Sequence, residues 1–505
     1  MDTKALRQKI LDLAIRGKLV PQDPNDEPAE VLLERIREQK QQMLKEGKLK
    51  KKDIKNDTII FKGEDNLHYE KFQDGTIKCI EDEIPFEVPE GWAWARLRDI
   101  CMMSAGKSKS TDQIKSEPFE GSYPCFGGNG VRGYVDEYNQ DGIFSIVGRQ
   151  GALCGNINIA IGKFYATEHA VVTTLFDGID FKWSNYILEA LRLNNYATGA
   201  AQPGLSVANI LNVFVPVPPT QEQDRIGNNV YESLKIVEAL EQEKIDLQKI
   251  IITAKTKILD LAIRGKLVPQ DPNDEPASVL LERIRTEKEE LIKQGKIKRD
   301  KKESVIFKGD DNSYYLRTGR VEESLEDWRF DDLPETWKIC CLGELCDYGD
   351  CINVNTEDIA EDAWILDLED IEKDTGTVLK KVTKAQRNSV STKHKFHSGQ
   401  VLYSKLRPYL NKVVLSDADG YCTSEILPLE FKNCVLPEYA RYYLMSGTFI
   451  AYANHCSYGV KMPRLGTTDG KKAIFSLPPL SEQKRIVETI DFCFVQLNKI
   501  SEALA

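Results

Sequence analysis

The sequence predicts an α/β (α+β) protein in which two globular domains with mixed sheets are separated by two long antiparallel coiled-coil helices. Three observations predict this class: a segment that occurs twice, a coiled-coil pattern of apolar residues inside it, and two unlike blocks rich in short β-branched and aromatic runs. The chain of 505 residues can hold several domains, and 41% apolar with 29% charged residues is an ordinary globular composition.

The duplicated segment arranges the chain as two similar halves. Residues 257–285 match residues 9–37 with a single difference, Glu30 against Ser278, and residues 217–226 (VPPTQEQDRI) return as residues 477–486 (LPPLSEQKRI). Projected onto the central copy by these shifts, the chain ends near residue 245 and begins near residue 249. We therefore expect a pseudo-twofold circular arrangement that is interrupted within one of two equivalent helices.

The central copy predicts one long helix. From Ile226 to Leu261 apolar residues recur at steps of four and three, and neither glycine nor proline occurs between Val230 and Ile263. The same seam is found near both termini, at Ile486, Ile490, Cys493, Leu497, Ile500 and Leu504, and at Leu6, Ile10 and Leu13. We expect the two ends together to form a second rod that pairs with the first. The alternative is a coiled coil that joins two whole molecules.

A shared linker and a shorter helix follow each rod. In the first copy, Gly17 is expected to end the rod, Asp26 to cap the next helix, and that helix to run from about Ala29 to Lys45. A lysine-rich tail follows in both copies. Such a tail is either a solvated, mobile segment or a contact for phosphate or a partner.

Two blocks that differ from each other lie between the repeats. Each opens with the same short motifs, FKG at residues 61–63 and 307–309, and PE-x-W at residues 89–92 and 334–337. Beyond these openings the blocks diverge, as expected of related scaffolds that bind different ligands. The expected domains are 1–55 (N-terminal repeat with its helical arm), 56–217 (first globular domain), 218–303 (central repeat with its arm), 304–477 (second globular domain) and 478–505 (C-terminal helix).

Charge is unevenly distributed in this chain, whose net charge is −11. Residues 380–416 contain no Asp or Glu but several Lys and Arg interleaved with aromatic residues, which indicates a local positive field suited to nucleic acid. The first block gives a weaker signal. Residues 142–167 lack carboxylates, and the glycine-rich run at residues 126–132 (FGGNGVR) would bring backbone close to a ligand. Each basic segment also fits a merely solvated surface.

The sequence offers no catalytic centre. It contains no GxxxxGK[ST] phosphate loop, no GxGxxG between a strand and a helix, and no HExxH. The 12 cysteines form no CxxC pair, and the cluster from Cys340 to Cys351 has no zinc-ligand spacing. We therefore expect no metal and a reducing, cytoplasmic compartment. No apolar run approaches the roughly 20 residues that a membrane span needs, so no membrane association is expected.

Together these features resemble the specificity subunits of type I restriction–modification systems. The most specific carriers are the two PP-x2-EQ-x-RI motifs, at residues 218–226 and 478–486, and the LDLAIRGKLVPQDP sequence at residues 11–24 and 259–272. The PE-x-W openings, GQVLYSKLRPY at residues 399–409 and TGAAQPGLS at residues 198–206 are similar to that family too. The counterpart of the last motif, SYGVKMPRL at residues 457–465, departs from the pattern, which leaves open whether both loops do the same thing.

The resemblance implies a non-catalytic DNA-recognition subunit. Its two target-recognition domains would each read one half of a bipartite double-stranded DNA site, and the paired rods would fix the spacing between the halves. The near-identical repeats would seat two methyltransferase subunits, which bind S-adenosylmethionine. Restriction subunits would join with ATP and Mg, and no cofactor is expected on this chain itself.

Candidate site residues follow from the charge pattern and the resemblance. The side chains expected to face DNA are Lys107, Lys109, Asn129, Arg132, Arg149, Gln150, Gln202, Lys393, Lys395, Tyr403, Ser404, Lys405, Arg407, Tyr409, Lys412 and Lys461. Those expected to face partner subunits are Arg16, Lys18, Leu32, Ile36, Arg264, Lys266, Leu280 and Ile284.

Two other functions remain compatible with the sequence. One is a self-contained nuclease or methyltransferase with degenerate motifs, which activity without partners would reveal. The other is a protein tether whose blocks bind proteins instead of DNA. Salt-sensitive DNA binding by the complex would argue against the tether, because phosphate neutralisation releases counterions.

Overall fold

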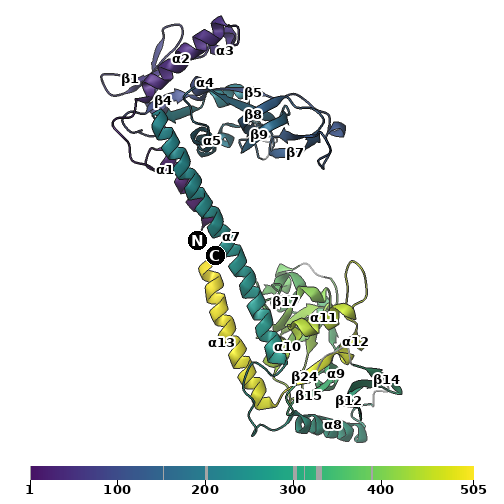
Figure 1. Ribbon diagram of the computed structural model, residues 1–505. Coiled ribbons are helices and arrows are strands. Elements are labelled where there is room, and N and C mark those ends of the chain that lie inside the picture. The colour runs from purple at the N-terminus through teal and green to yellow at the C-terminus, as the bar shows by residue number, and fades with distance from the viewer. Residues whose placement is uncertain are drawn as a thin grey trace. The chain divides into compact units, whose positions relative to one another are not determined.

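The structure, a computed structural model, describes residues 2–151, 153–199, 203–298, 304–311, 313–325, 333–387 and 390–504 (Figure 1). The chain divides into two compact units, Met1–Lys244 and Ile245–Ala505, and the boundary falls inside helix α7 (Thr220–Ile263). Among the residues described, no helix combines the length and the apolar character that a membrane crossing requires.

The first unit is built on a six-stranded sheet with the order β5-β10-β8-β9-β6-β7. Its helices are α1 (Thr3–Ile15), α2 (Ala29–Lys45), α3 (Lys51–Ile54), α4 (Leu97–Ile100), α5 (Phe181–Ala190), α6 (Val207–Leu211) and the first part of α7. Its strands are β1 (Ile59–Lys62), β2 (His68–Lys71), β3 (Ile77–Cys79), β4 (Ala93–Arg96), β5 (Cys101–Ala105), β6 (Tyr123–Gly127), β7 (Gly130–Val135), β8 (Gln140–Gly148), β9 (Ile157–Ala166), β10 (Ala170–Leu175) and β11 (Phe214–Val217).

The second unit contains a five-stranded sheet, β16-β19-β22-β17-β18, and a three-stranded sheet, β21-β20-β23. Its helices are the rest of α7, α8 (Ala277–Lys293), α9 (Leu342–Leu345), α10 (Pro437–Leu444), α11 (Gly447–His455), α12 (Thr467–Lys472) and α13 (Leu480–Leu504). Its strands are β12 (Ser304–Lys308), β13 (Tyr314–Thr318), β14 (Val321–Ser324), β15 (Lys338–Cys341), β16 (Ile352–Val354), β17 (Trp364–Leu366), β18 (Val382–Thr383), β19 (Lys393–Phe396), β20 (Val401–Ser404), β21 (Val413–Leu415), β22 (Gly420–Thr423), β23 (Ile426–Leu429) and β24 (Ile474–Leu477).

Both large sheets are mixed, which confirms the predicted fold class. Strand β6 runs parallel to β9 in the first unit, and β17 runs parallel to β22 in the second, while the other neighbouring strands of these sheets are antiparallel. In the first unit Trp183 of α5, Val171 of β10 and Ile226 of α7 belong to one buried cluster. The start of the long helix is therefore part of the core of the domain.

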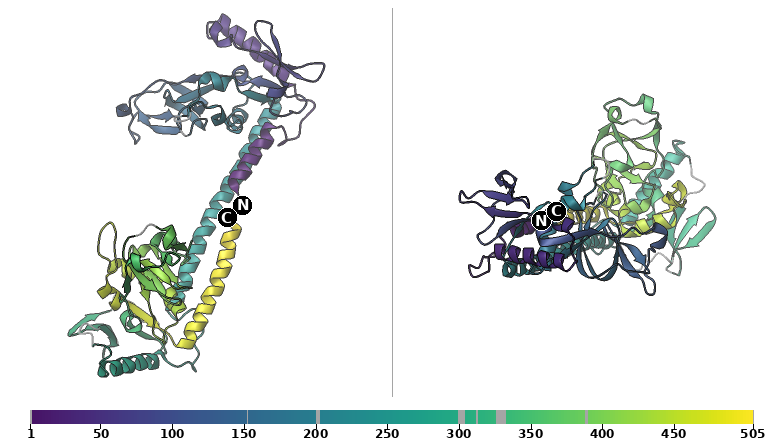
Figure 2. Two further views of the ribbon diagram at one scale, coloured as in Figure 1. Left: turned by 180° about the vertical axis from the view of Figure 1, so that it is seen from behind. Right: turned by 90° about the horizontal axis from the view of Figure 1, so that it is seen from above.

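The long helix predicted from the seam is confirmed, and each terminal helix accompanies one half of it within its own unit (Figure 2). Leu11 of α1 lies in the same buried cluster as Ile226 of α7. In the second unit, Lys255 of α7 donates to Asn498 of α13 at 2.6 Å, while Leu259 shares a cluster with Ile490. Residue numbers rise along α7 as they fall along α13, so these two helices are antiparallel.

In the first unit, the repeated motifs meet in a buried joint at the start of α7. Glu222 is 1% exposed, and it accepts hydrogen bonds from the indole N–H of Trp92 at 3.0 Å and the amide of Gln22 at 3.1 Å. Burial raises the pKa of the Glu222 carboxyl. One turn later, Arg225 forms an ion pair with Asp26 of the linker. Three repeated segments thus contact one another here: the PE-x-W opening, the linker and the PP-x2-EQ-x-RI motif.

The second unit builds the same joint from its own copies of these motifs. Glu482 is fully buried and accepts from the indole N–H of Trp337 at 3.0 Å and from the amide of Gln270 at 2.6 Å. Arg485 pairs with Asp274 at 2.7 Å. The repeated sequence motifs therefore form the same structural contact in both units. Each copy fixes a domain to the start of a rod helix.

The arm helix α2 has the predicted bounds, Ala29–Lys45, but the predicted cap is wrong. Pro28 occupies the N-cap position without a side-chain hydrogen bond, and the backbone N–H of Ala29 donates to Gly91 O at 2.8 Å. Asp26 is instead recruited to Arg225. Asp26 therefore lies two residues before the N-cap position and stabilises the joint instead of the helix end.

The joint predicts the effect of removing one indole N–H. Trp92→Phe should lower the free energy of unfolding by about 1.5–3 kcal/mol, because Glu222 loses a donor to a buried carboxylate. Trp94→Phe is the matched control, since Trp94 is 3% exposed and its Nε1 has no hydrogen-bond partner within the described part of the chain. Urea titration followed by circular dichroism measures both variants. Equal destabilisation by the two substitutions would contradict the joint.

Candidate nucleic-acid interface

In the first unit the candidate interface lies where strand β8 ends. There the backbone meets residues 198–205, which we call the first strap loop. Leu205 N donates to Arg149 O at 2.8 Å, and Gly151 N donates to Pro203 O at 3.1 Å. The loop is closed at its base by two hydrogen bonds of 2.9 Å between the backbones of Thr198 and Gly204. The end of β8 is therefore held against a strap.

The second unit repeats this arrangement where strand β20 ends, with residues 458–465 as the second strap loop. Leu465 N donates to Lys405 O at 3.0 Å, and Arg407 N donates to Pro463 O at 2.7 Å. Tyr458 and Arg464 exchange backbone hydrogen bonds of 3.1 and 3.0 Å at the base of the loop. The sequence left open whether the two loops correspond, and their backbone pairing does correspond.

The side chains carried by this shared backbone differ between the units. In the first, the strand end continues as Arg149-Gln150-Gly151, and in the second as Lys405-Leu406-Arg407. The strap positions that read Ala200, Ala201 and Gln202 in the first loop read Val460, Lys461 and Met462 in the second. Residues 200–202, including the predicted Gln202, lie outside the described residues. One scaffold thus presents two different chemical surfaces.

The glycine-rich run of the first unit approaches the protein's own strand β8 closely. A Cβ at Gly148 would lie 1.9 Å from Gly128 O, so a side chain there would clash with the β6–β7 turn. This contact brings exposed Asn129 beside the end of β8, where it accepts a hydrogen bond from Asn156 at 3.0 Å. The structure therefore gathers Asn129, Arg149 and Gln150 at one end of the sheet.

The polar candidates of the first unit differ in their exposure to solvent. Lys107, Arg132 and Gln150 are exposed, and Arg132 donates to the hydroxyl of Thr111 at 3.1 Å. The Lys109 side chain is only 9% exposed, pairs with Glu137 at 2.7 Å and lies over the Tyr165 ring. Lys109 is therefore withdrawn from the proposed interface, because its charge is already matched inside the domain.

The carboxylate-free stretch of the second unit is neutralised by acids from elsewhere in the chain. Lys381 pairs with Asp417 at 2.7 Å, Lys384 with Glu361 at 2.9 Å, and Arg387 with Asp367 and Asp370. The expectation of a positive field along all of residues 380–416 was therefore too broad. An acidic segment before the stretch and Asp417 after it fold onto the stretch and remove most of its charge.

Four cations of that stretch have no ion-pair partner in the part of the chain that the structure describes, and one of them, Lys412, donates to Leu368 O at 2.6 Å instead. Lys395 is exposed, Lys405 and Arg407 are partly exposed, and none of them forms an ion pair with any residue that the structure describes. Arg407 has a left-handed backbone, with a φ of 51°, and its Nε is buried without a partner among those residues. A non-glycine residue in this conformation is strained, and such strain is common at binding sites. Exposed Tyr409 lies two residues further, in the 3₁₀ helix η7 (Pro408–Leu410).

Four other predicted contacts of the second unit point into the domain. Tyr403 is 3% exposed and packs on Phe449, and Ser404 is also 3% exposed and donates to Leu406 O at 2.9 Å. The Lys393 side chain is 3% exposed, and Lys412 donates to a backbone oxygen at 2.6 Å. Strand β20 is buried on both faces and Lys393 is buried at the start of β19, so we withdraw these four as DNA contacts.

The structure adds a pair of residues that the charge pattern did not select. The guanidinium of Arg464 bonds both carboxylate oxygens of Glu425, at distances of 2.8–3.1 Å, and so anchors the base of the second strap loop. The corresponding position in the first loop is Gly204. Alignment of the two loops by the 260-residue shift would have drawn attention to this difference.

The apolar residues predicted to face partner subunits belong instead to the cores of their own units. Leu32 and Ile36 of α2 are each 1% exposed, Leu280 of α8 is 6% exposed, and Ile284 is partly buried against the same cluster. An amphipathic helix packs its apolar face on the nearest core, which here is its own domain. The predicted linker residues remain accessible: Lys18, Arg264 and Lys266 are exposed and Arg16 is partly exposed.

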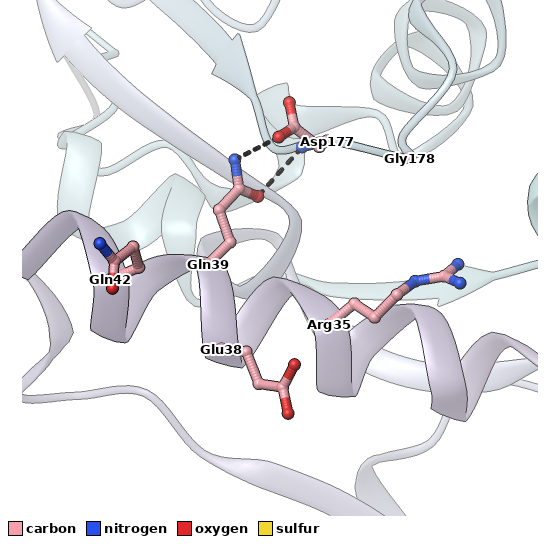
Figure 3. Close-up of a pocket in the computed structure, with 6 residues that line it drawn as sticks. All are labelled: Arg35, Glu38, Gln39, Gln42, Asp177 and Gly178. Carbon is pink, nitrogen blue, oxygen red and sulfur yellow. Dashed lines mark hydrogen bonds between the residues drawn. The ribbon is translucent and has the colours of Figure 1, made fainter.

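The polar face of α2 is also engaged within the unit. Figure 3 shows the side chain of Gln39 of α2 in contact with Asp177. The side-chain amide N–H of Gln39 donates to the Asp177 carboxylate at 2.9 Å, and the backbone N–H of Asp177 donates to Gln39 Oε1 at 3.2 Å. Arg35, Glu38 and Gln42 line the shallow pocket beside this contact. No group of three potential metal ligands is present among the described residues.

Comparisons with known proteins agree with the duplicated architecture. The family model for the "Type I restriction modification DNA specificity domain" matches residues 89–254 and again residues 334–503. Two relatives from Escherichia coli are the EcoAI specificity subunit, 28% identical with 98% of this chain and 90% of the relative covered, and the EcoEI specificity subunit, 26% identical with 99% and 90% covered.

The likeness to solved structures is weak. A chain from a structure described as the basis of complex assembly and conformational transition of the type I R-M system aligns with a TM-score of 0.49 and 15% identity, covering 83% of this chain and 94% of that one. The family model covers most of the chain and matches once in each half. This protein therefore belongs to the family of type I restriction–modification DNA specificity domains, and it carries that domain twice.

Proposed function

We propose that this chain is the DNA-recognition subunit of a type I restriction–modification complex and that each unit reads one half of a bipartite site. The observation that carries the proposal is the shared strap scaffold. Two domains hold the same backbone against the end of a strand and present different side chains on it, Arg149-Gln150-Gly151 in one and Lys405-Leu406-Arg407 in the other. Different residues at equivalent places are what two reading heads for two sequences require.

The remaining candidates divide between positioning and reading. Lys107, Arg132, Lys395, Lys405 and Lys461 are suited to phosphate contacts, which fix register on the duplex. Asn129, Gln150 and Arg407 have the planar amide or guanidinium groups that recognise base edges in pairs of hydrogen bonds. Tyr409 adds an exposed ring beside Arg407.

The rods set the distance between the two half-sites in this proposal. Helix α7 has 44 residues, which at about 1.5 Å per residue gives a length of about 66 Å. The domains would be 56–217 and 304–477, with residues 1–55, 218–303 and 478–505 forming the repeats and rods. The two copies of the joint would offer two methyltransferase subunits the same surface, including Lys18 and Lys266 of the linkers.

The catalytic parts of such a complex would come from the partner chains. Methyltransferase subunits would supply S-adenosylmethionine, and restriction subunits would supply ATP and Mg, in the cytoplasm. This chain would supply no reacting group, and its contribution would be to hold the target adenine at a fixed place relative to the bound partners.

Removal of one charge tests the second reading head. Arg407→Ala should weaken binding of the assembled complex to its site by about 1–3 kcal/mol and relax preference only in the half-site of the second unit. Arg320→Ala is the matched control, since this exposed arginine lies in the β13–β14 turn and carries the same charge. Fluorescence anisotropy with cognate and mismatched duplexes gives both readouts. Unchanged affinity and unchanged site preference for the Arg407 variant would rule out its assigned role.

The bipartite arrangement predicts the form of the methylation motif. Co-expression with the methyltransferase subunit in an unmethylated host, followed by mapping of methylated adenines, should give two short specified parts around a fixed unspecified spacer. A continuous motif would mean that only one unit reads DNA. Absence of methylation by an assembled complex would favour a protein tether.

A further inference from the structure

The second strap loop exposes three apolar side chains to solvent. Val460 is fully exposed, at 101% of its reference area, while Tyr458 is 62% and Met462 45% exposed. Lys461, which lies between Val460 and Met462, is exposed as well. Single exposed apolar residues are normal, but this loop places three of them within five residues at the candidate interface.

The tip is carried on a rigid base. Tyr458 and Arg464 are joined by two backbone hydrogen bonds, and Arg464 is fixed by both oxygens of Glu425. The backbone of Pro463 receives the N–H of Arg407, and Leu465 donates to Lys405. The base of the loop is thus anchored before binding, which reduces the entropy that ordering the loop on a ligand costs.

The chemistry of base edges limits what these side chains can recognise. In the major groove the bases present hydrogen-bond donors and acceptors, and the one apolar group among them is the 5-methyl of thymine. Lys405 and Arg407 lie beside the loop and can bind phosphates or the polar edges of bases. Val460 and Met462 can form no hydrogen bond through their apolar ends, so a methyl group is the partner that suits them.

We propose that Val460 and Met462 contact thymine 5-methyl groups in the half-site of the second unit and thereby set the sequence preference at those positions. This inference rests on the proposed function, because it assigns the readout chemistry of one of its two reading heads. It also accounts for a sequence difference between two loops whose bases form equivalent backbone hydrogen bonds: the first has Ala200 and Gln202 at the sequence positions of Val460 and Met462.

The sequence of the first strap loop suggests substitutions to test in the second. Val460→Ala and Met462→Gln place the residues of the first strap loop on the second one, so they suit the loop sequence of this fold. Val321→Ala is the matched control, because Val321 is 58% exposed on strand β14, outside the strap loop. All variants are to be tested as the complex with the methyltransferase subunit.

The probes are duplexes of the mapped methylation site in which single thymines of the second half-site are replaced by uracil, which lacks only the methyl group. For the unaltered complex, uracil at a contacted position should weaken binding about fourfold, the value of one buried methylene-sized group. Val460→Ala or Met462→Gln should abolish that sensitivity at one position each, and Val321→Ala should preserve it.

Two results would overturn the inference: a second half-site that contains no thymine on either strand, or uracil sensitivity that both strap variants retain in full. Failure of the proposed function would look different. In that case the methylation motif would have no second half, and Arg407→Ala would also leave binding unchanged.

Discussion

The buried carboxylates of Glu222 and Glu482 are the contacts on which the placement of each domain depends. Each one gathers an indole N–H from the domain entry and an amide N–H from the linker at the first turn of a rod helix. A buried charge is tolerated only when hydrogen bonds satisfy it, so the three segments stabilise one another and none can be altered alone. The direction in which a domain leaves its rod is thereby fixed.

Two equivalent joints hold two domains whose surfaces differ. The same separation between repeated support and variable surface is found elsewhere in the chain. Repeated segments hold backbone in place, while the unlike blocks supply recognition. The sheets of the two blocks differ, but the straps close on the ends of β8 and β20 with equivalent backbone hydrogen bonds. At these strand ends the side chains differ, as Gln150 does from Leu406. A fold of this kind can acquire a new specificity without disturbing its assembly.

Electrostatics in the second unit show why charge counted along a sequence is a poor guide to a binding surface. The acids that neutralise Lys381 and Arg387 come from before and after the basic stretch, and they meet it only in the folded domain. Lys405 and Arg407, which have no ion-pair partner among the described residues, lie at the strap. A few cations at defined positions orient a duplex with less non-specific attraction than a uniformly basic surface would produce.

The sequence by itself determined the two-fold repetition, the long helix, the arm helix Ala29–Lys45 and the family, because these depend on local periodicity and on motifs that recur. It could not determine that strand β20 is buried on both of its faces, and so it placed Tyr403 and Ser404 on the surface. It also gave Leu32 and Ile36 to a partner, although their own core lies nearer. Only the tertiary structure decided these points, since burial and ion pairing depend on segments far apart in the chain.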